Sequence, residues 1–309
     1  MNFSNASKIF VLLGKILFMP SIKPTDLLIN PDGSIYHLNL KPEQLADSII
    51  VVGDPGRVSE ISHFFDHVEC KVQNREFVTH TGVYKGKRIS ALSTGIGTDN
   101  IDIVMNELDA LVNVDLTTRE IKKEHKTLTI VRLGTSGAIQ EDIPVDSFAL
   151  SLYGLGFDNL VHFYEAGHAG LDKAMSDAFM KHTNWNPDLS TPYFVKGSEK
   201  LINLLKAEMV TGITATATGF YGPQGRVVRL GLHDPDLNNK IQSFRYNGER
   251  IINFEMETSA LYSLGAMLGH DMATVCLLIA NRATLDFSND HKPHIRRLVE
   301  LVLEKISGL

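Results

Sequence analysis

The sequence contains little cysteine, one tryptophan and no surplus of positive charge. Its 309 residues include two cysteines, Cys70 and Cys276, which lie far apart and without the spacing of metal ligands. We therefore expect two reduced thiols, and neither a disulfide framework nor a zinc site. The formal net charge of -6 provides no basic surface for nucleic acid or for an anionic membrane. Any anionic ligand must be held by a few individually placed arginines.

Long uninterrupted hydrophobic runs are also missing. The most apolar stretch near the N-terminus, residues 9–19, is broken by Lys15 and is too short to span a bilayer. A secretory signal is an alternative, but no Ala-x-Ala-like cleavage site follows the stretch. We expect residues 1–30 to form an N-terminal extension and linker, or translation to begin at Met19. The protein is expected to be cytoplasmic.

Apolar strand-like runs and amphipathic helix-like runs alternate from about residue 47 onward. Strands are predicted near 49–52, 89–93, 127–134, 145–152, 213–220, 251–256 and 272–280. One predicted helix places Ile101, Val104, Leu108 and Leu111 on one face. Alternation of this kind predicts an α/β protein with a parallel or mixed sheet between helices. No internal boundary is evident, so residues 31–309 are expected to form a single domain.

The segment Val51–Val58 has the pattern of an anion-binding turn. A short apolar strand is followed by Gly53, by Asp54 as a helix cap, by Pro55 at the first helical position and by Arg57. Free N–H groups at a helix start, the positive end of the helix dipole and a guanidinium would converge on one point. An ordinary Gly-Asp-Pro turn is the alternative interpretation.

Two further arginines and two glycine-rich segments extend this pattern. Residues 93–100 and 132–138 each follow a predicted strand and have the composition of backbone nests that carry hydroxyls. Arg132 adjoins an apolar strand, where a buried guanidinium needs an anion, a carboxylate or a structural ion pair. Arg75, in the segment 74–77, could instead be a solvated charge at a strand edge.

Two later segments carry groups suited to a ring and to a sugar. Phe220 can stack on a planar ring, Gln224 offers a donor and an acceptor, and Arg226 offers donors only, which together suit a pyrimidine edge. In an extended segment Glu255 and Glu257 point the same way. Carboxylates bind vicinal hydroxyls well, although capping of the following helix is an equal alternative.

Taken in order, these segments resemble the nucleoside phosphorylase superfamily, and within it the uridine phosphorylases, from about His37 to the C-terminus. The matching motifs are Tyr36-His37-Leu38, Gly53 to Arg57, Asn74 to Phe77, Ser93 to Gly97, Arg132 to Gly137, Phe220 to Arg226, Phe254 to Glu257 and Ala280-Asn281-Arg282. The resemblance implies a single α/β domain whose central mixed β-sheet is partly barrel-like and flanked by helices.

The resemblance also implies a role for each matching position. Phosphate would be held by Gly53, Arg57, Arg132 and Thr135, together with Arg75 of the partner subunit. Ribose would be held by Glu255, Met256 and Glu257, and its 5′-hydroxyl by His37 of the partner subunit. Uracil would be held by Phe220, Gln224, Arg226, Ile279 and Arg282. The Gln-x-Arg pair favours a pyrimidine, and purine-specific relatives carry an aspartate acid near Asn281.

The implied activity is phosphorolytic cleavage of uridine to uracil and ribose 1-phosphate, a pentosyltransferase reaction of pyrimidine salvage. Arg226, Gln224, Glu257 and Arg132 would be the catalytic residues. Phosphate is the co-substrate, and no cofactor is expected. The alternatives are a purine or broad-specificity phosphorylase, a nucleosidase that uses water, and an inactive nucleoside-binding paralogue. Retention of the arginines argues against a nucleosidase.

The resemblance further implies a homo-oligomer, a dimer or a hexamer, built from dimers with shared active sites. Glu76, Ile96 and Asn100 match positions at which some relatives bind a structural monovalent cation such as potassium, although Asn100 replaces their serine. The chain also departs from bacterial relatives at Gly222-Pro223, whose order is reversed, and in the segments 153–168 and 227–231.

Overall fold

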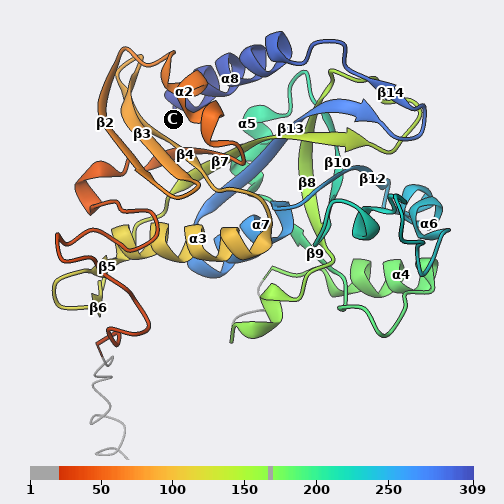
Figure 1. Cartoon of the computed structure of the whole chain (residues 1–309), viewed down its shortest axis with the longest axis horizontal. Coiled ribbons are helices and arrows are strands. Elements are labelled where there is room, and N and C mark those ends of the chain that lie inside the picture. Colours follow the sequence, from red (N-terminus) through yellow and green to blue (C-terminus); the bar gives the residue numbers. More distant parts are fainter. Residues whose placement is uncertain (1–20, 166–169) are drawn as a thin grey trace, which may run out of the picture.

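The computed structural model describes residues 21–165 and 170–309 (Figure 1). The secretory-signal alternative and the start at Met19 concern residues outside these ranges. No helix in the described ranges is long and apolar enough to cross a membrane.

Helices and strands are interspersed along the chain, with runs of consecutive strands at β2 to β4 and β5 to β8. The helices are α2 (Pro55–Ser62), α3 (Thr98–Asn113), α4 (Lys173–Thr183), α5 (Glu199–Leu205), α6 (Leu237–Ser243), α7 (Thr258–Leu268) and α8 (Lys292–Ser307), with short 3-10 turns η1 (Pro42–Gln44), η2 (Leu160–Phe163) and η3 (Gly222–Gln224). The strands are β1 (Ser48–Val52), β2 (His67–Asn74), β3 (Phe77–Tyr84), β4 (Lys87–Ser93), β5 (Val114–Asp115), β6 (Glu120–Ile121), β7 (Thr129–Ala138), β8 (Phe148–Gly156), β9 (Tyr193–Lys196), β10 (Val210–Thr216), β11 (Arg245–Tyr246), β12 (Glu249–Glu255), β13 (Asp271–Asn281) and β14 (Asp286–Phe287).

The main sheet is mixed, and part of it closes into a barrel. Within the described residues, twelve strands follow the order β11-β12-β10-β8-β13-β7-β1-β4-β3-β2, with β14 added to β13 and β9 added to β8. Strand β12 also pairs with β7, so that β12, β10, β8, β13 and β7 form a closed ring of strands. Strands β1, β4, β3 and β2 extend from this ring. The predicted fold class, with its partly barrel-like mixed sheet, is confirmed.

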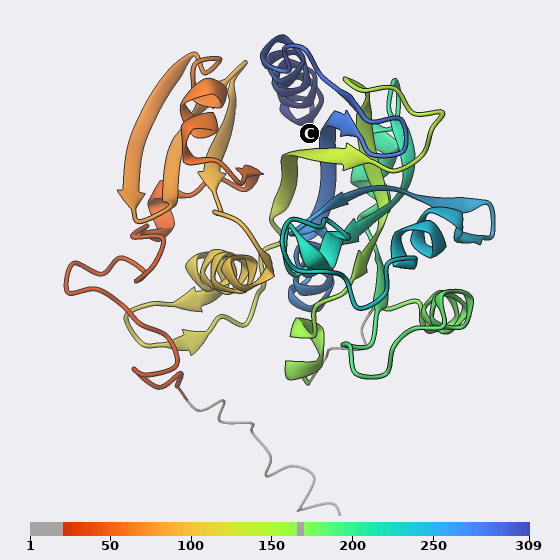
Figure 2. The same cartoon turned by 45° about the vertical axis from the view of Figure 1, so that its right-hand side comes forward.

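Helices cover both faces of the sheet beside the barrel. Along β1, Ile49 and Val51 belong to the core shared with α3 and α7, whereas Ile50 and Val52 belong to the core shared with α2, α5 and α8. This alternation is the expected result of a strand buried on both faces. Figure 2 shows α4 and α6 on the side of the barrel opposite the β2–β4 extension.

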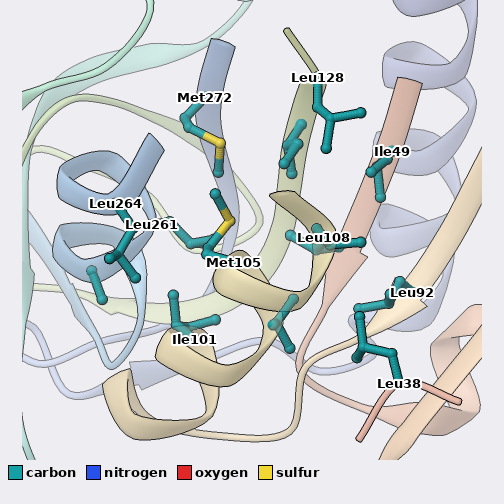
Figure 3. Close-up of a cluster of buried hydrophobic side chains, with 14 of the residues drawn as sticks. Leu38, Ile49, Leu92, Ile101, Met105, Leu108, Leu128, Leu261, Leu264 and Met272 are labelled. Carbon is teal, nitrogen blue, oxygen red and sulfur yellow. The ribbon is translucent and has the colours of Figure 1, made fainter. Parts of the chain in front are cut away.

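The contact between α3 and α7 fixes the elements that border the cavity described below. Figure 3 shows Ile101 and Met105 of α3 on the side of Leu261 and Leu264 of α7, whereas Leu108 extends toward Ile49 and Leu92 of the sheet. These side chains are essentially inaccessible to solvent. The predicted apolar face of α3 is confirmed, and its burial against α7 holds the starts of both helices in place.

Two predictions about local structure need correction, and one hairpin was missed. The segment 132–138 is not a loop but the second half of β7, because it pairs with β13 on one side and β12 on the other. The strand predicted at 213–220 ends at Thr216, so residues 217–221 belong to a loop. The β2–β3 hairpin was not predicted, since β2 alternates only between exposed and half-exposed residues and lacks an apolar run.

Candidate active site

A cavity of about 770 Å³ lies at the carboxyl ends of β1, β4, β7, β12 and β13, bordered by the loop that carries η3. Such a position is typical of ligand sites in α/β sheets. The predicted site residues that line it are Gly53, Arg57, Glu76, Ile96, Asn100, Arg132, Thr135, Phe220, Gln224, Arg226, Glu255, Met256, Glu257 and Ile279. The remaining predicted residues, His37, Arg75 and Arg282, lie outside the lining of this cavity.

Arg57 occupies the end of the cavity next to β1. The start of α2 forms as predicted: Asp54 accepts a hydrogen bond from the Gly56 N–H at 2.8 Å, and Pro55 is the first helical residue. The Gly56 N–H is therefore engaged, and the available donor at this helix start is the Arg57 guanidinium. Its Nη1 donates to the Leu133 carbonyl at 3.3 Å, and no acidic side chain among the described residues pairs with it. Burial lowers the pKa of Arg57.

Arg132 lies deeper, in a buried cluster with two carboxylates. Its Nη1 is 3.2 Å from Oε2 of Glu255, and its Nη2 donates to Oε2 of Glu257. Nη1 also lies 3.3 Å from Sγ of Cys276. The buried Nε has no partner within the described part of the chain. An unpartnered buried donor of this kind is costly unless a ligand accepts from it.

The two glutamates have different tasks. Glu255 accepts from the backbone N–H groups of Glu257 and Thr258 and from the Thr216 hydroxyl at 2.6 Å, so it caps the start of α7. Glu257 instead accepts from the Gly97 N–H at 2.8 Å and faces the cavity. The capping alternative therefore applies to Glu255, and sugar binding by Glu257 stays a prediction.

The charges of this cluster do not balance, since one guanidinium faces two carboxylates. Burial disfavours the charge of Arg132, but Glu257 and Glu255 outweigh it and raise the pKa of Arg132. Burial raises the pKa of Glu257 although Arg132 opposes the shift, and Glu255 adds to the rise. Within the described residues, Arg132 therefore compensates the buried charge of Glu257 only in part.

The opposite end of the cavity has an aromatic face and a preformed polar pair. The Arg226 guanidinium lies 3.8 Å from the Phe220 ring centroid. Its Nη1 donates to Oε1 of Gln224 at 2.5 Å and to the Phe220 carbonyl at 2.6 Å. Burial lowers the pKa of Arg226. With Oε1 engaged by Arg226, the Gln224 amide nitrogen remains as a donor, so this end presents donors to a flat ring.

Arg282 lies behind this end rather than inside the cavity. Its guanidinium is 5.6 Å from the Phe254 ring, and burial, aided by Arg226, lowers the pKa of Arg282 to about 10. Asn281 is buried and donates to the carbonyls of Gln140 and Ile143, so its side chain supports a loop.

The two residues predicted to serve the partner's site lie together, away from the cavity of their own chain. Arg75 is exposed at the turn between β2 and β3 and lies 6.0 Å from the Tyr36 ring. Asn74 donates to the His37 carbonyl at 2.8 Å. His37 and Arg75 therefore belong to one surface patch.

The predicted cation ligands do not form an oxygen cage within one chain. The Asn100 amide nitrogen donates to Oε1 of Glu76 at 3.2 Å, where a cation would need an oxygen. Residues 21–165 and 170–309 contain no cluster of three acidic, histidine or cysteine side chains suited to a metal ion.

Sequence reasoning missed several residues that shape the site. Phe254, Phe287 and Ser136 line the cavity, and the Gly97 N–H orients Glu257. Glu107 was also missed, although a signal was available: it falls three residues after Val104, on the apolar face of α3, where a charge must have a partner.

Fold and cavity together define an α/β protein whose cavity is lined by the guanidinium groups of Arg57, Arg132 and Arg226 and by the carboxylate of Glu257. The chain matches the phosphorylase superfamily over residues 47–306 and belongs to that family. It is a pentosyltransferase, and members of the family use phosphate as co-substrate without a cofactor. The family predicted from the ordered motifs is therefore confirmed.

Two curated relatives illustrate the range within the family. The uridine phosphorylase of Thermococcus kodakarensis is 31% identical over 262 residues, which cover 83% of this chain and 80% of the relative. A DeoD-type purine nucleoside phosphorylase of Anoxybacillus flavithermus is 28% identical over 271 residues, which cover 87% of this chain and 97% of the relative.

Solved structures share the fold. A Trypanosoma brucei nucleoside phosphorylase that shows uridine phosphorylase activity superposes with a TM-score of 0.82 at 31% identity, covering 92% of this chain and 100% of that one. A structure from work on two uridine phosphorylases of the oomycete Phytophthora capsici gives a TM-score of 0.67 at 22% identity, covering 94% and 99%, and supports the fold alone.

Proposed function

We propose that this chain cleaves uridine with phosphate to give uracil and ribose 1-phosphate. The observation that carries the proposal is the hydrogen-bonded pair of Gln224 and Arg226 against the Phe220 ring at one end of the cavity. These groups complement the oxygen-rich edge of a pyrimidine. The uridine phosphorylase activity of two similar proteins supports the same substrate.

Phosphate would bind between Gly53, Arg57 and Thr135, close to Arg132. Arg57 brings a guanidinium without an acidic partner among the described residues, and Arg132 brings a buried Nε that lacks an acceptor. Both are suited to a phosphate dianion, because guanidinium groups bind its oxygens with directed, charge-assisted hydrogen bonds.

Ribose would lie midway, with its hydroxyls on Glu257. That carboxylate is fixed by Arg132 and the Gly97 N–H, so it can accept from the sugar without reorganising. Met256 lines the same part of the cavity and would cover the sugar ring. Glu255 would act indirectly, by capping α7 and orienting Glu257.

In the reaction, the bond between C1′ and N1 breaks, and its electron pair stays with uracil. The negative charge spreads onto the carbonyl oxygens of the base, where Arg226 and Gln224 would stabilise it. A phosphate oxygen supplies the electron pair of the new bond to C1′. The phosphate dianion also stabilises the positive charge that develops on the sugar before this bond is complete. The uracil anion then takes up a proton from solvent, and the newly formed ribose 1-phosphate releases the proton of its phosphate group to solvent, so the protons balance. Arg282, behind Phe254, would add positive potential, and Ile279 would cover the base.

A purine substrate is the second candidate, because the DeoD-type relatives are purine nucleoside phosphorylases. No aspartate stands at Asn281 to protonate a purine ring, and the Asn281 amide is engaged by backbone carbonyls. This arrangement favours the pyrimidine.

The proposal includes a homo-oligomer in which each active site takes His37 and Arg75 from a partner subunit. The enzyme would act in the cytoplasm, in pyrimidine salvage. A structural potassium ion near Glu76 remains a prediction, and no step of the reaction depends on it.

Release of free base from uridine, deoxyuridine, thymidine, inosine and adenosine, each with and without phosphate, tests the proposal. We expect phosphate-dependent cleavage, with uridine far faster than inosine. Equal rates for uridine and inosine would overturn the base assignment. Equal rates with and without phosphate would identify a nucleosidase instead.

A further inference from the structure

Glu107 is a buried carboxylate that serves residues distant from it in sequence. It lies in the middle of α3, and only 7% of its surface is exposed. Its Oε2 accepts from the Leu38 N–H at 2.8 Å, and its two oxygens share the His37 N–H, at 3.0 Å from Oε1 and 3.1 Å from Oε2. Its Oε1 lies 2.6 Å from Nδ1 of His37. A buried charge on an apolar helix face is costly, and these three contacts offset that cost.

These contacts determine which nitrogen of His37 carries the proton. An ionised carboxylate can only accept hydrogen bonds, so Nδ1 of His37 must be the donor toward Glu107. In the neutral ring the proton then resides on Nδ1, and Nε2 is left as an acceptor. No hydrogen bond engages Nε2 within the described ranges, and the His37 side chain is 27% exposed. The free atom of the ring is therefore an acceptor at the surface.

The same segment is held beside Arg75. Asn74, the residue before Arg75, donates to the carbonyls of both Tyr36 and His37. Two residues distant in sequence, Asn74 and Glu107, therefore hold the segment 36–38 at one place on the surface. A segment in which four backbone polar groups are held in this way is prearranged rather than ordered on binding.

We propose that Glu107 is a positioning residue for the nucleoside. By holding His37 in the Nδ1-protonated form with Nε2 outward, it makes Nε2 the acceptor for the 5′-hydroxyl of a nucleoside in the partner subunit's site. This inference rests on the proposed function, which places His37 at that hydroxyl. It adds a residue that touches no substrate but sets the direction of the hydrogen bond.

Substitution of Glu107 by glutamine reverses the polarity of the contact with little change of shape. The glutamine oxygen at the Oε2 position can still accept from the Leu38 N–H and the His37 N–H, although the His37 N–H loses its second acceptor at the Oε1 position. The amide nitrogen at the Oε1 position then donates to Nδ1 of His37, which must become the acceptor, and the proton moves to Nε2.

Spectra of ¹⁵N-histidine-labelled protein at about pH 8.5, two units above the ordinary pKa of imidazole, report the protonated nitrogen directly. The His37 signals are those that disappear in His37→Ala. We expect Nδ1 protonation in the native protein and Nε2 protonation in Glu107→Gln. Nε2 protonation in the native protein would overturn the inference. This measurement needs no activity, so it stands even if uridine is not the substrate.

Kinetics test the consequence for the substrate. Uridine can donate its 5′-hydroxyl hydrogen, whereas 5′-O-methyluridine can only accept. The native protein should prefer uridine, and Glu107→Gln should reduce that preference by about tenfold, the scale of one hydrogen bond. Damage to the fold alone would lower both rates in proportion and leave the preference unchanged.

The exposed Glu124→Gln variant is the matched control, and its preference should equal that of the native protein. An unchanged preference in Glu107→Gln, with uridine still cleaved, would contradict the role of Glu107. Absence of uridine cleavage by the native protein would contradict the proposed function instead. The two failures are thus distinguishable.

Discussion

Arg132 of β7 and Glu257 at the start of α7 form a buried ion pair between residues 125 positions apart, and Glu255 approaches the same guanidinium at 3.2 Å. Replacing Arg132 by alanine leaves two buried carboxylates without a counter-charge. We expect Arg132→Ala to lower the free energy of unfolding by about 3–5 kcal/mol. Phosphate KM should rise and kcat should fall in the same variant.

The destabilisation of Arg132→Ala should depend on pH. Without the guanidinium, the pKa of Glu257, already raised by burial, should rise further above its value in the unfolded chain. The folded state then binds more protons than the unfolded state, so stability falls as pH rises through this window. Urea unfolding at about pH 5 and pH 8 should show a larger deficit at the higher pH. A deficit independent of pH would contradict this account of the cluster.

Gly134 lies against the Arg132 guanidinium. A Cβ at Gly134 would lie 2.3 Å from Nη1 of Arg132 and 2.9 Å from Sγ of Cys276, so Gly134→Ala must displace the guanidinium. We expect a loss of about 1–3 kcal/mol of stability and a higher phosphate KM. Gly231→Ala is the control, because nothing lies within 4 Å of its Cβ. Equal phosphate KM values for the two variants would show that Arg132 does not bind phosphate.

Arg226 is expected to act on the leaving base. Arg226→Ala should raise the barrier for uridine cleavage by about 2–4 kcal/mol, the scale of one preorganised donor to a developing oxyanion. The exposed Arg229→Ala, three residues away, should retain native activity. Measurement of kcat/KM for both variants checks the expectation. Similar losses in the two would indicate a general effect of charge in this loop.

Sharing of active sites between subunits can be tested by mixing inactive variants. If the sites are shared as proposed, Arg75→Ala should damage the site of the partner, whereas Arg226→Ala should damage the site of its own chain. In a mixed dimer one site carries both lesions and the other carries none. Equal mixing makes about half of the dimers mixed, so activity should return to about a quarter of native. Confirmed subunit exchange without recovery would show that Arg75 does not serve a partner.

The sequence alone determined the α/β class, the family and most of the cavity lining. Buried strands such as β1 are short apolar runs, and the turn from Gly53 to Arg57 follows from local chemistry, in which Asp54 caps and Pro55 starts a helix. Ordered motifs along the chain then located Arg132, Glu257 and the pair near Arg226. These signals are local, so one sequence suffices to read them.

Tertiary structure decided which of these residues meet, because pairing across the sheet depends on contacts distant in sequence. Only the pairing of β12 with β7 closes the barrel and brings Glu257 to Arg132. Residues 132–138 have the composition of a loop, yet neighbouring strands on both sides hold them as a strand. The position of Glu107 on an apolar helix face indicates that it needs a partner, but the sequence does not show which one. Glu107 becomes buried because α3 packs against α7 and the segment 36–38 lies over it. Its carboxylate then accepts hydrogen bonds from this segment and holds His37 in place.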